Sequence, residues 1–333
     1  SSVADRQFGG IFRYDAAAVI SDDASADEIS DLEGRLAASE YTAGILGAVQ
    51  TVKDVSSDTY TAEGCYVCAP REPSEINRFI ALRQRESGAA LSIPEDKVII
   101  NEKLARLLGA DIGGEIGIEG TDKSFAVAGI TENYTGNYVY MSPALYQDAF
   151  GEYDDNIVFL DLKSRLDIGI FTELLLKEDA VSAVSSADEG SEKFHSLVGS
   201  LDMIIIMVIG FAGALAMVIL FNLASINITE RTHELATIKV LGFFDGEVTS
   251  YILRENAIST LIGIVCGLFP GALLEKFIIR ASEVDAVMFS PEIPAYCYAA
   301  AAAVTFVFAA VINLAMHFGL KKIDMVMSLK AVE

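Results

Sequence analysis

The sequence is poor in basic residues, histidine and cysteine. Of its 333 residues, 24 are Lys or Arg against 47 Asp or Glu, three are His and four are Cys. Nucleic-acid binding requires basic side chains for the phosphates, so this deficit of cations argues against a nucleic-acid partner. The acidic balance favours solubility and cationic ligands.

Several catalytic motifs are also missing. No G-x-x-x-x-G-K-[ST] sequence occurs, so the chain is not expected to hold ATP phosphates in a P-loop. His233-Glu234 begins like the zinc motif H-E-x-x-H, but the fifth position is Thr237, which leaves the second zinc ligand missing. No G-x-S-x-G nucleophile occurs either. We expect no enzyme activity, no metal and no cofactor.

The four cysteines carry little functional signal. Cys266 and Cys297 lie in apolar segments, where they are expected to pack as small hydrophobic residues. Cys65 and Cys68 form a C-x-x-C in a strand-like stretch, with no second pair and no nearby His to complete a zinc site. A chance pair or a local disulfide is favoured over a redox centre.

Charge divides the chain into two expected domains. Residues 1–198 carry 16 Lys and Arg against 35 Asp and Glu, a net charge of −19, whereas residues 199–333 carry 8 against 12, a net charge of −4. The second part contains uncharged apolar windows at 203–225, 257–274 and 295–320. Each can cross a bilayer, which takes about 20 residues. We expect spans at about 201–225, 250–275 and 295–320. Buried core helices of a soluble protein are the alternative.

Residues 1–198 alternate short strands with helices. Strands at 15–20 and 41–52 flank a helix at 25–39, which a Ser25 cap begins. Residues 97–118 predict a strand, a helix capped by Asn101 and closed by Gly109, and another strand. The other expected elements are helices at 75–85, 143–150 and 167–177 and strands at 125–130, 137–142, 157–162 and 180–186. This pattern predicts an α+β or α/β domain on a mixed sheet.

The second apolar window has glycines four residues apart. Gly263, Gly267 and Gly271 form G-x-x-x-G twice on one helix face, a spacing that lets helices approach closely in lipid. Packing within one subunit and packing between subunits are equally compatible with it. Pro270 is expected to kink this helix.

The connection between the first two windows has the pattern of an amphipathic helix at about 228–242. Asn227 and Glu230 resemble a capping box, and Gly242 ends the helix. Its apolar face consists of Leu235, Ile238 and Leu241.

Two acidic residues on this helix favour a docking role. Glu230 and Glu234 lie one turn apart, a like-charge pair that destabilises an isolated helix and indicates a cationic groove on a partner. A helix resting on lipid headgroups is the alternative, but such helices are rich in Lys and Arg, and this one has Arg231 and Lys239 alone.

Basic residues in the short connections predict the orientation. The 275–294 connection has two, Lys276 and Arg280, and the other side has five: Arg231, Lys239, Lys321, Lys322 and Lys330. Cytoplasmic loops carry the excess, which places 226–247 and the C-terminus in the cytoplasm and the acidic domain outside. Because the chain starts SSVADRQFGG, with no Met and no signal sequence, we expect it to be a piece of a larger protein with a span just before Ser1.

The segment 222–267, NLASINITERTHELATIKVLGFFDGEVTSYILRENAISTLIGIVCG, resembles the signature region of the FtsX-like permease family, the MacB-type ABC transporter permeases. The pattern is E-R-x-x-E-[IL]-A-x-[IL]-[KR]-x-[IL]-G. VIINEKLARLLGADIGGEI resembles a segment of the family's extracellular domain, and KKIDMVMSLKAVE resembles the ending of large Gram-positive members.

The resemblance implies an architecture and a set of partners. The family has one span, an extracellular domain and then three spans. The helix at 228–242 would be the coupling helix that docks on a separate cytoplasmic ATPase, through Glu230, Arg231, Glu234, Lys239 and the turn at Gly242. A second permease unit, as a tandem repeat or a dimer, and membrane lipid complete the expected partners, in a Gram-positive cell membrane. A membrane-tethered receptor or adhesin without ATPase coupling is the alternative function.

Overall fold

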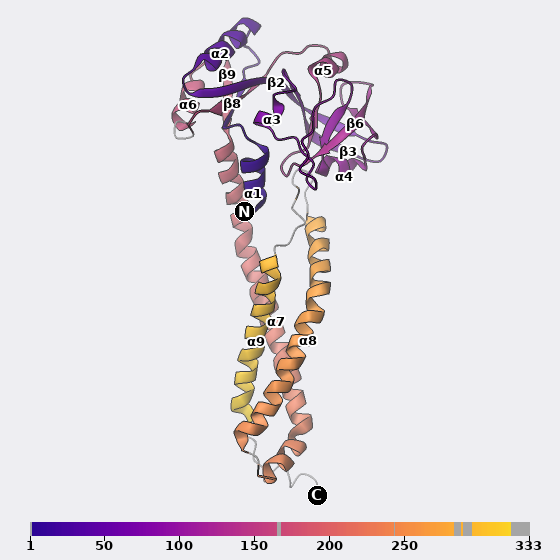
Figure 1. Cartoon of the computed structure of the whole chain (residues 1–333), viewed down its shortest axis with the longest axis vertical. Helices are drawn as coiled ribbons and strands as arrows, with labels where there is room; N and C mark the ends of the chain where they lie inside the picture. Colours follow the sequence, from indigo (N-terminus) through magenta and orange to yellow (C-terminus); the bar gives the residue numbers. More distant parts are fainter. Residues whose placement is uncertain (1, 165–167, 243, 283–287, 289–294, 321–333) are drawn as a thin grey trace. The chain divides into compact units, whose positions relative to one another are not determined.

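The structure is a computed structural model that describes residues 2–164, 168–242, 244–282, 288 and 295–320. It divides into two compact units (Figure 1). The first unit comprises Ser1–Val198 and Ser282–Ser290, and the second Gly199–Ala281 and Pro291–Glu333.

The first unit combines nine strands with short helices. The strands are β1 (Ala16–Ile20), β2 (Thr42–Ser56), β3 (Thr61–Pro70), β4 (Val98–Asn101), β5 (Glu115–Ile118), β6 (Ser124–Thr131), β7 (Tyr138–Tyr140), β8 (Ile157–Leu162) and β9 (Val181–Ser186). The helices are α1 (Ser2–Arg6), the π-helical turn η1 (Gln7–Ile11), α2 (Ala26–Ala38), α3 (Ile76–Phe79), α4 (Glu102–Leu108), α5 (Pro143–Phe150) and α6 (Ile168–Leu175). The predicted α+β domain with a mixed sheet is confirmed.

The sheet contains a closed ring of strand pairings. Its order is β3-β7-β4-β6-β5-β2-β8-β1-β9, and β3 also pairs with β2. The pairs β3–β7 and β4–β6 are parallel and the others are antiparallel. The 15-residue strand β2 makes the closure, since it pairs with β3, β5 and β8 along its length.

The described residues form three hydrophobic core clusters, and two of them lie at the two ends of this sheet. Inside the ring, β6 alternates buried and less buried residues, and Val98 and Ile100 of β4 pack with Leu104 and Leu108 of α4. At the other end, β1 and β8 pack against α2 and α6, with residues such as Leu32 and Phe171 in the core. Alternation with a period of two gives each strand one face toward its core.

The ends of α2 and α4 can be compared with the helix caps that the sequence predicts. The Ser25 capping box is confirmed: the Ser25 hydroxyl accepts from the Glu28 amide at 3.4 Å, and the Glu28 carboxylate accepts from the Ser25 amide at 2.8 Å. Gly109 ends α4 in the left-handed region, as predicted. Asn101 precedes α4 but does not cap it with its side chain. That side chain is buried and forms hydrogen bonds with the backbone of Gly136 and Tyr138. These hydrogen bonds to the start of β7 replace the expected helix cap.

The helix predicted at 75–85 is wrong over most of its length. Only α3 (Ile76–Phe79) is helical, and the residues after it extend along other segments. Ala81 donates its amide to the Ile11 carbonyl, and Leu82 donates to the Asn77 side chain. Tertiary hydrogen bonds thus replace the helical ones. The helix predicted at 167–177 is α6, and residues 165–167 lie outside the described part of the chain.

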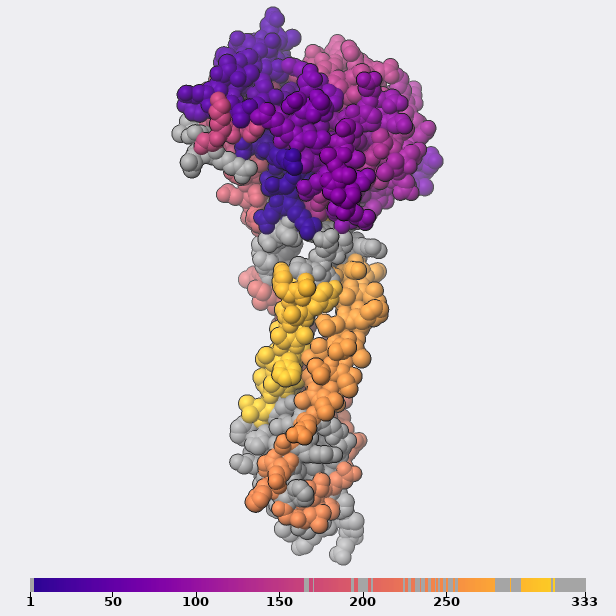
Figure 2. Space-filling view, viewed as in Figure 1, coloured from indigo at the N-terminus to yellow at the C-terminus, as the bar shows by residue number. Residues whose placement is uncertain are grey.

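The second unit consists of long helices: α7 (Ala187–Val240), α8 (Asp245–Ser282) and α9 (Ala295–Leu320). Their apolar windows are Ile206–Leu223, Ala257–Ile278 and Ala295–Ile312. At most 11% of any window is buried, so the apolar side chains of these helices are exposed. Figure 2 shows α8 and α9 in space-filling form, in orange and yellow. Core helices of a soluble protein would bury that surface, whereas spans expose it to lipid. Pro270, the residue expected to kink this helix, lies inside α8.

Candidate functional site

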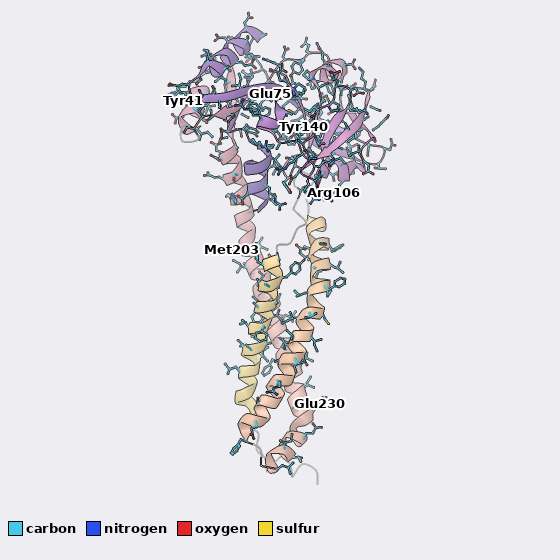
Figure 3. The ribbon with its side chains drawn as sticks, in the orientation of Figure 1. Tyr41, Glu75, Arg106, Tyr140, Met203 and Glu230 are labelled. Atoms are coloured by element: carbon cyan, nitrogen blue, oxygen red, sulfur yellow. The ribbon has the colours of Figure 1, made fainter. Side chains whose placement is uncertain are left out.

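The expected coupling segment is the end of α7 rather than a separate helix. α7 runs without interruption for 54 residues, through the first apolar window and on to Val240. The capping box expected at Asn227 and Glu230 is therefore wrong, since both positions are interior to the helix. Figure 3 labels Met203 and Glu230, which lie on α7 before and after its apolar window.

Glu230 and Glu234 are exposed one turn apart on α7. Arg231 and Lys239 lie on the same part of the helix, and their side chains are outside the described residues. Gly242 has a φ of 99° and stands just after the helix, which explains why glycine ends it.

A short turn joins α7 to α8 and leaves apolar side chains in the open. Phe244 donates its amide to the Glu247 carboxylate at 3.0 Å, and the Glu247 amide donates to the Phe244 carbonyl at 2.9 Å, which begins α8. Leu241 is 74% exposed and Phe244 76% exposed. Phe243 lies outside the described residues. This turn therefore exposes two apolar side chains, Leu241 and Phe244, in the segment that follows Glu230 and Glu234.

A cavity of about 750 Å³ opens between α7, α8 and α9. Glu230 is on its wall, with Ile226 beside it and Thr260, Gly263 and Thr305 from the other helices. Glu230 thus has two environments, the exposed face of α7 and the rim of an apolar cavity.

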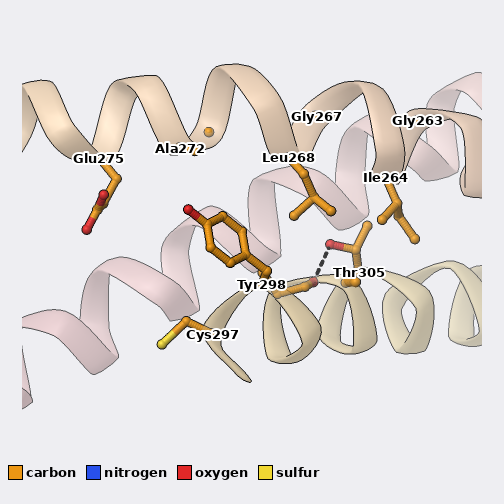
Figure 4. A pocket seen from close by; sticks show the side chains of 12 residues that line it. Gly263, Ile264, Gly267, Leu268, Ala272, Glu275, Cys297, Tyr298 and Thr305 are labelled. Carbon is orange, nitrogen blue, oxygen red and sulfur yellow. Dashed lines mark hydrogen bonds between the residues drawn. The ribbon is translucent and has the colours of Figure 1, made fainter. Parts of the chain in front are cut away.

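A second pocket of about 440 Å³ lies between α8 and α9 (Figure 4). Gly263, Gly267 and Gly271 line it. A methyl group added at any of the three would meet no atom within 4 Å. Among the described residues, the glycine face therefore does not bring α8 into close contact with another helix.

The two cysteines of the C-x-x-C lie in different core clusters. Cys65 and Cys68 are free, and their three-residue spacing on β3 places them on opposite faces, one in each of two core clusters. Burial raises the pKa of each thiol to about 12, and the Asp54 carboxylate adds to the rise at Cys65. Their placement on opposite faces of β3 disfavours a disulfide between them.

A buried ionic cluster lies beside β2 in the first unit. Arg71 pairs with Glu33 at 2.6 Å and also with Asp155, whose side chain is fully buried. Burial raises the pKa of Asp155; Arg71 opposes this rise and Glu33 adds to it. Gly47 faces both carboxylates so closely that a Cβ would overlap them. Within the described residues, no group of three His, Cys, Asp or Glu side chains could hold a metal ion.

The connection between α8 and α9 enters the core of the first unit at Met288. This residue is fully buried and packs in a cluster with residues such as Phe79 and Tyr134. Its amide donates to the Tyr134 carbonyl at 2.9 Å, and Arg106 Nη2 donates to its sulfur at 3.5 Å. Figure 3 labels Arg106 on the first unit. Sequence reasoning missed Met288, because a single Met in a short connection between two apolar windows carries no periodic signal.

Comparisons with known proteins find similarity to ABC transporter permeases. Residues 206–320 match the family described as FtsX-like permease C-terminal. The chain is 24% identical over 189 residues to YknZ of Bacillus subtilis (strain 168), described as an uncharacterized ABC transporter permease. That alignment covers 52% of this chain and 47% of YknZ, so the chain spans about half the length of this relative.

Solved structures of extracellular regions resemble the chain more remotely. The periplasmic region of MacB from Actinobacillus actinomycetemcomitans aligns with a TM-score of 0.38 and 13% identity, covering 58% of this chain and 97% of that one. The extracellular domain of the transporter YknZ from Gram-positive bacteria aligns with a TM-score of 0.35 and 13% identity, covering 52% and 98%. The match over residues 206–320 and the three apolar helices indicate a membrane protein whose helical part is similar to the FtsX-like permeases.

Proposed function

We propose that this permease couples ATP hydrolysis by a separate cytoplasmic ATPase to movement of its β-sheet unit outside the membrane. The observation that carries the proposal is the continuity of α7, which begins directly after β9 at Ala187 and ends at Val240. At 1.5 Å per residue, its 54 residues measure about 81 Å. A helix of this length is stiff enough to transmit a displacement from one end to the other.

The end of α7 is the proposed docking surface for the ATPase. Glu230 and Glu234 are exposed there, and carboxylates one turn apart suit a basic groove on a partner. Exposed Leu241 and Phe244 in the following turn supply apolar contacts beside them. Arg231, Lys239 and Gly242 belong to the same proposed surface.

The proposed orientation places this surface in the cytoplasm. Basic residues are more numerous on the side of residues 226–247 and the C-terminal tail than in the 275–294 connection, which supports that sidedness. The acidic first unit is then extracellular, at the plasma membrane of a Gram-positive cell. Three spans form half of a two-fold assembly, so a second permease unit, as a tandem repeat or a second copy, completes the transporter.

The proposed output is export, extraction or signalling that involves a peptide, a lipoprotein or a drug. A moving outer domain can displace any of these without a continuous pore.

Co-purification from the native membrane tests the ATPase partner. The protein is isolated as wild type and as the double variant Glu230→Lys/Glu234→Lys, and the associated proteins are identified by mass spectrometry. We expect a P-loop ATPase with the wild type and its loss from the double variant, because charge reversal repels a basic groove.

Glu192→Lys is the matched control, since Glu192 is an exposed glutamate on the same helix near its other end. It should retain the ATPase. Absence of any ATPase from a folded wild-type sample would overturn the proposal in favour of a membrane-tethered receptor or adhesin.

A further inference from the structure

The pocket between α8 and α9 is an open space with apolar walls. Leu268 and the three glycines of α8 line one side, and Ala301 and Ala302 of α9 line the other (Figure 4). Its volume of about 440 Å³ is within the range of small-molecule sites. Gly263, Ile264 and Thr305 also line the 750 Å³ cavity, so the two spaces adjoin.

Glu275 lies on the wall of this pocket, at the opposite end from Gly263 (Figure 4). Its Oε2 atom is buried and has no hydrogen-bond partner in the described part of the chain. The Thr305 hydroxyl, which also lines the pocket, donates its hydrogen bond to the Ala301 carbonyl at 2.9 Å and not to Glu275. Glu275 also lies inside the apolar window Ala257–Ile278. The side chain is partly buried near the end of this window, where a carboxylate is stabilised by pairing with a cation or a donor.

The chemistry of the pocket defines its ligand. A buried carboxylate oxygen without a partner requires a positively charged donor, and the apolar remainder of the wall requires an alkyl chain. Tyr298 lies on the wall between the two regions, where an aromatic face can attract an ammonium group (Figure 4).

We infer that this pocket binds an amphiphile with an ammonium head group and an alkyl tail. The ammonium pairs with Glu275, and the tail lies along the glycine face toward the 750 Å³ cavity. This site goes beyond the proposed coupling to an ATPase, because binding here needs neither ATP nor the end of α7. The ligand is either an aminophospholipid of the bilayer or a free cationic amphiphile, and the experiment separates these sources.

Two native cysteines make the site measurable. Cys297 lines the pocket, whereas Cys266 is exposed on α8 and does not. The full chain in nanodiscs of phosphatidylglycerol, which lacks an ammonium group, is treated with N-ethylmaleimide, and labelling of each thiol is followed by peptide mass spectrometry. Dodecylammonium should slow labelling of Cys297 and leave Cys266 unchanged, and uncharged dodecanol should protect Cys297 far less.

The variant Glu275→Gln keeps the size of the side chain and removes its charge. It should raise the dodecylammonium concentration required for protection roughly 30-fold, the effect of losing one partner of a buried charge pair. Glu192→Gln, a change at an exposed glutamate of α7, should leave that concentration unaltered.

A second readout does not depend on thiol reactivity. The chain has no tryptophan, so Leu268→Trp places a single emitter on the pocket wall. Dodecylammonium with a bromine at its tail should quench this emission, and it should do so at higher concentration in the Glu275→Gln background.

The bilayer arm identifies the source of the ligand. If Cys297 is already protected in nanodiscs that contain phosphatidylethanolamine, the occupant is a bilayer aminolipid. If Cys297 is labelled equally in both nanodiscs and added dodecylammonium protects it, the occupant is a free amphiphile. Equal protection by dodecanol, or quenching that is unaffected by Glu275→Gln, would overturn the inference.

Discussion

The amide of Met288 donates a hydrogen bond to the carbonyl oxygen of Tyr134 at 2.9 Å. Tyr134 is itself held by the N-terminal segment, since its amide donates to Gln7 Oε1 at 2.8 Å and Arg6 donates to its hydroxyl at 3.3 Å. One short loop of the β-sheet unit therefore contacts both the start of the chain and the connection between two spans. In the proposed mechanism, this loop is a second route for movement, beside α7.

We expect Met288→Ala to destabilise the attachment of the connection by about 2–5 kcal/mol, the usual result of deleting a buried methionine side chain. Hydrogen exchange of the full chain should show faster exchange of the amide at position 288. Met203→Ala is the control, because Met203 is exposed, and it should change neither value. Unaltered exchange in Met288→Ala would show that the backbone bond suffices.

A proline in α7 tests the helix as a lever. Ser196 is exposed between the β-sheet unit and the apolar window, and Ser196→Pro removes a helical hydrogen bond at a cost of about 3 kcal/mol. We expect membrane insertion and ATPase binding to persist, and ATP-dependent changes in protease protection of the β-sheet unit to disappear. Ser196→Ala should behave as wild type. Retention of those changes in the proline variant would argue that α7 does not transmit the movement.

The ionic cluster predicts a pH dependence of stability. Because burial raises the pKa of Asp155 above its ordinary value of 3.8, the folded state binds this proton more tightly than the unfolded state. The resulting stabilisation is fully present below pH 3.8 and is lost as pH rises through the raised pKa. Asp155→Asn removes the titration, so the free energy of unfolding should fall less steeply above pH 3.8 in the variant.

Urea unfolding at a series of pH values measures this slope. Asp148→Asn is the control, since the Asp148 side chain is 68% exposed. An identical slope in wild type and Asp155→Asn would exclude Asp155 as the source of the dependence.

The thiols of β3 should be inert in the folded protein. The thiolate is the reactive form, and burial raises the pKa of Cys65 and Cys68 to about 12, so neither should react with N-ethylmaleimide near neutral pH. Both should react after unfolding in urea. Mild oxidation should produce no disulfide between them, as mass spectrometry of the intact chain would show. A disulfide in the folded protein would contradict their placement on opposite faces of the strand.

Local patterns predicted local structure well. The Ser25 capping box and the Gly109 helix end are confirmed because each depends on residues within one turn. The three apolar helices follow from composition alone. The helix predicted at 75–85 fails because its polar groups find partners distant in sequence, such as the Ile11 carbonyl. The closure of the sheet by β2 and β3 is likewise nonlocal.

The site was only partly predictable. Glu230 and Glu234 were identified by their charge pattern, and their exposure agrees with a docking surface without testing it. The helix start expected at Asn227 is wrong because α7 passes through that position, and interior helical hydrogen bonds outweigh a cap that the sequence also permits. Glu275 has a sequence signal, a single acid next to a long apolar run, but its orphaned oxygen is visible only in three dimensions.

The ladder between β1 and β9 ends where α7 begins. Ser186 pairs with Ala16, and the next amide, that of Ala187, donates to the Asp15 carbonyl at 3.1 Å. The two strands are antiparallel, so the chain enters β1 and leaves β9 at the same end of the ladder. A force that draws these two ends apart peels the ladder and breaks its hydrogen bonds one at a time, whereas a force along the strands shears all of them together. The attachment of α7 is therefore weak toward a force that separates Ser186 from Ala16 and strong toward a force directed along β9.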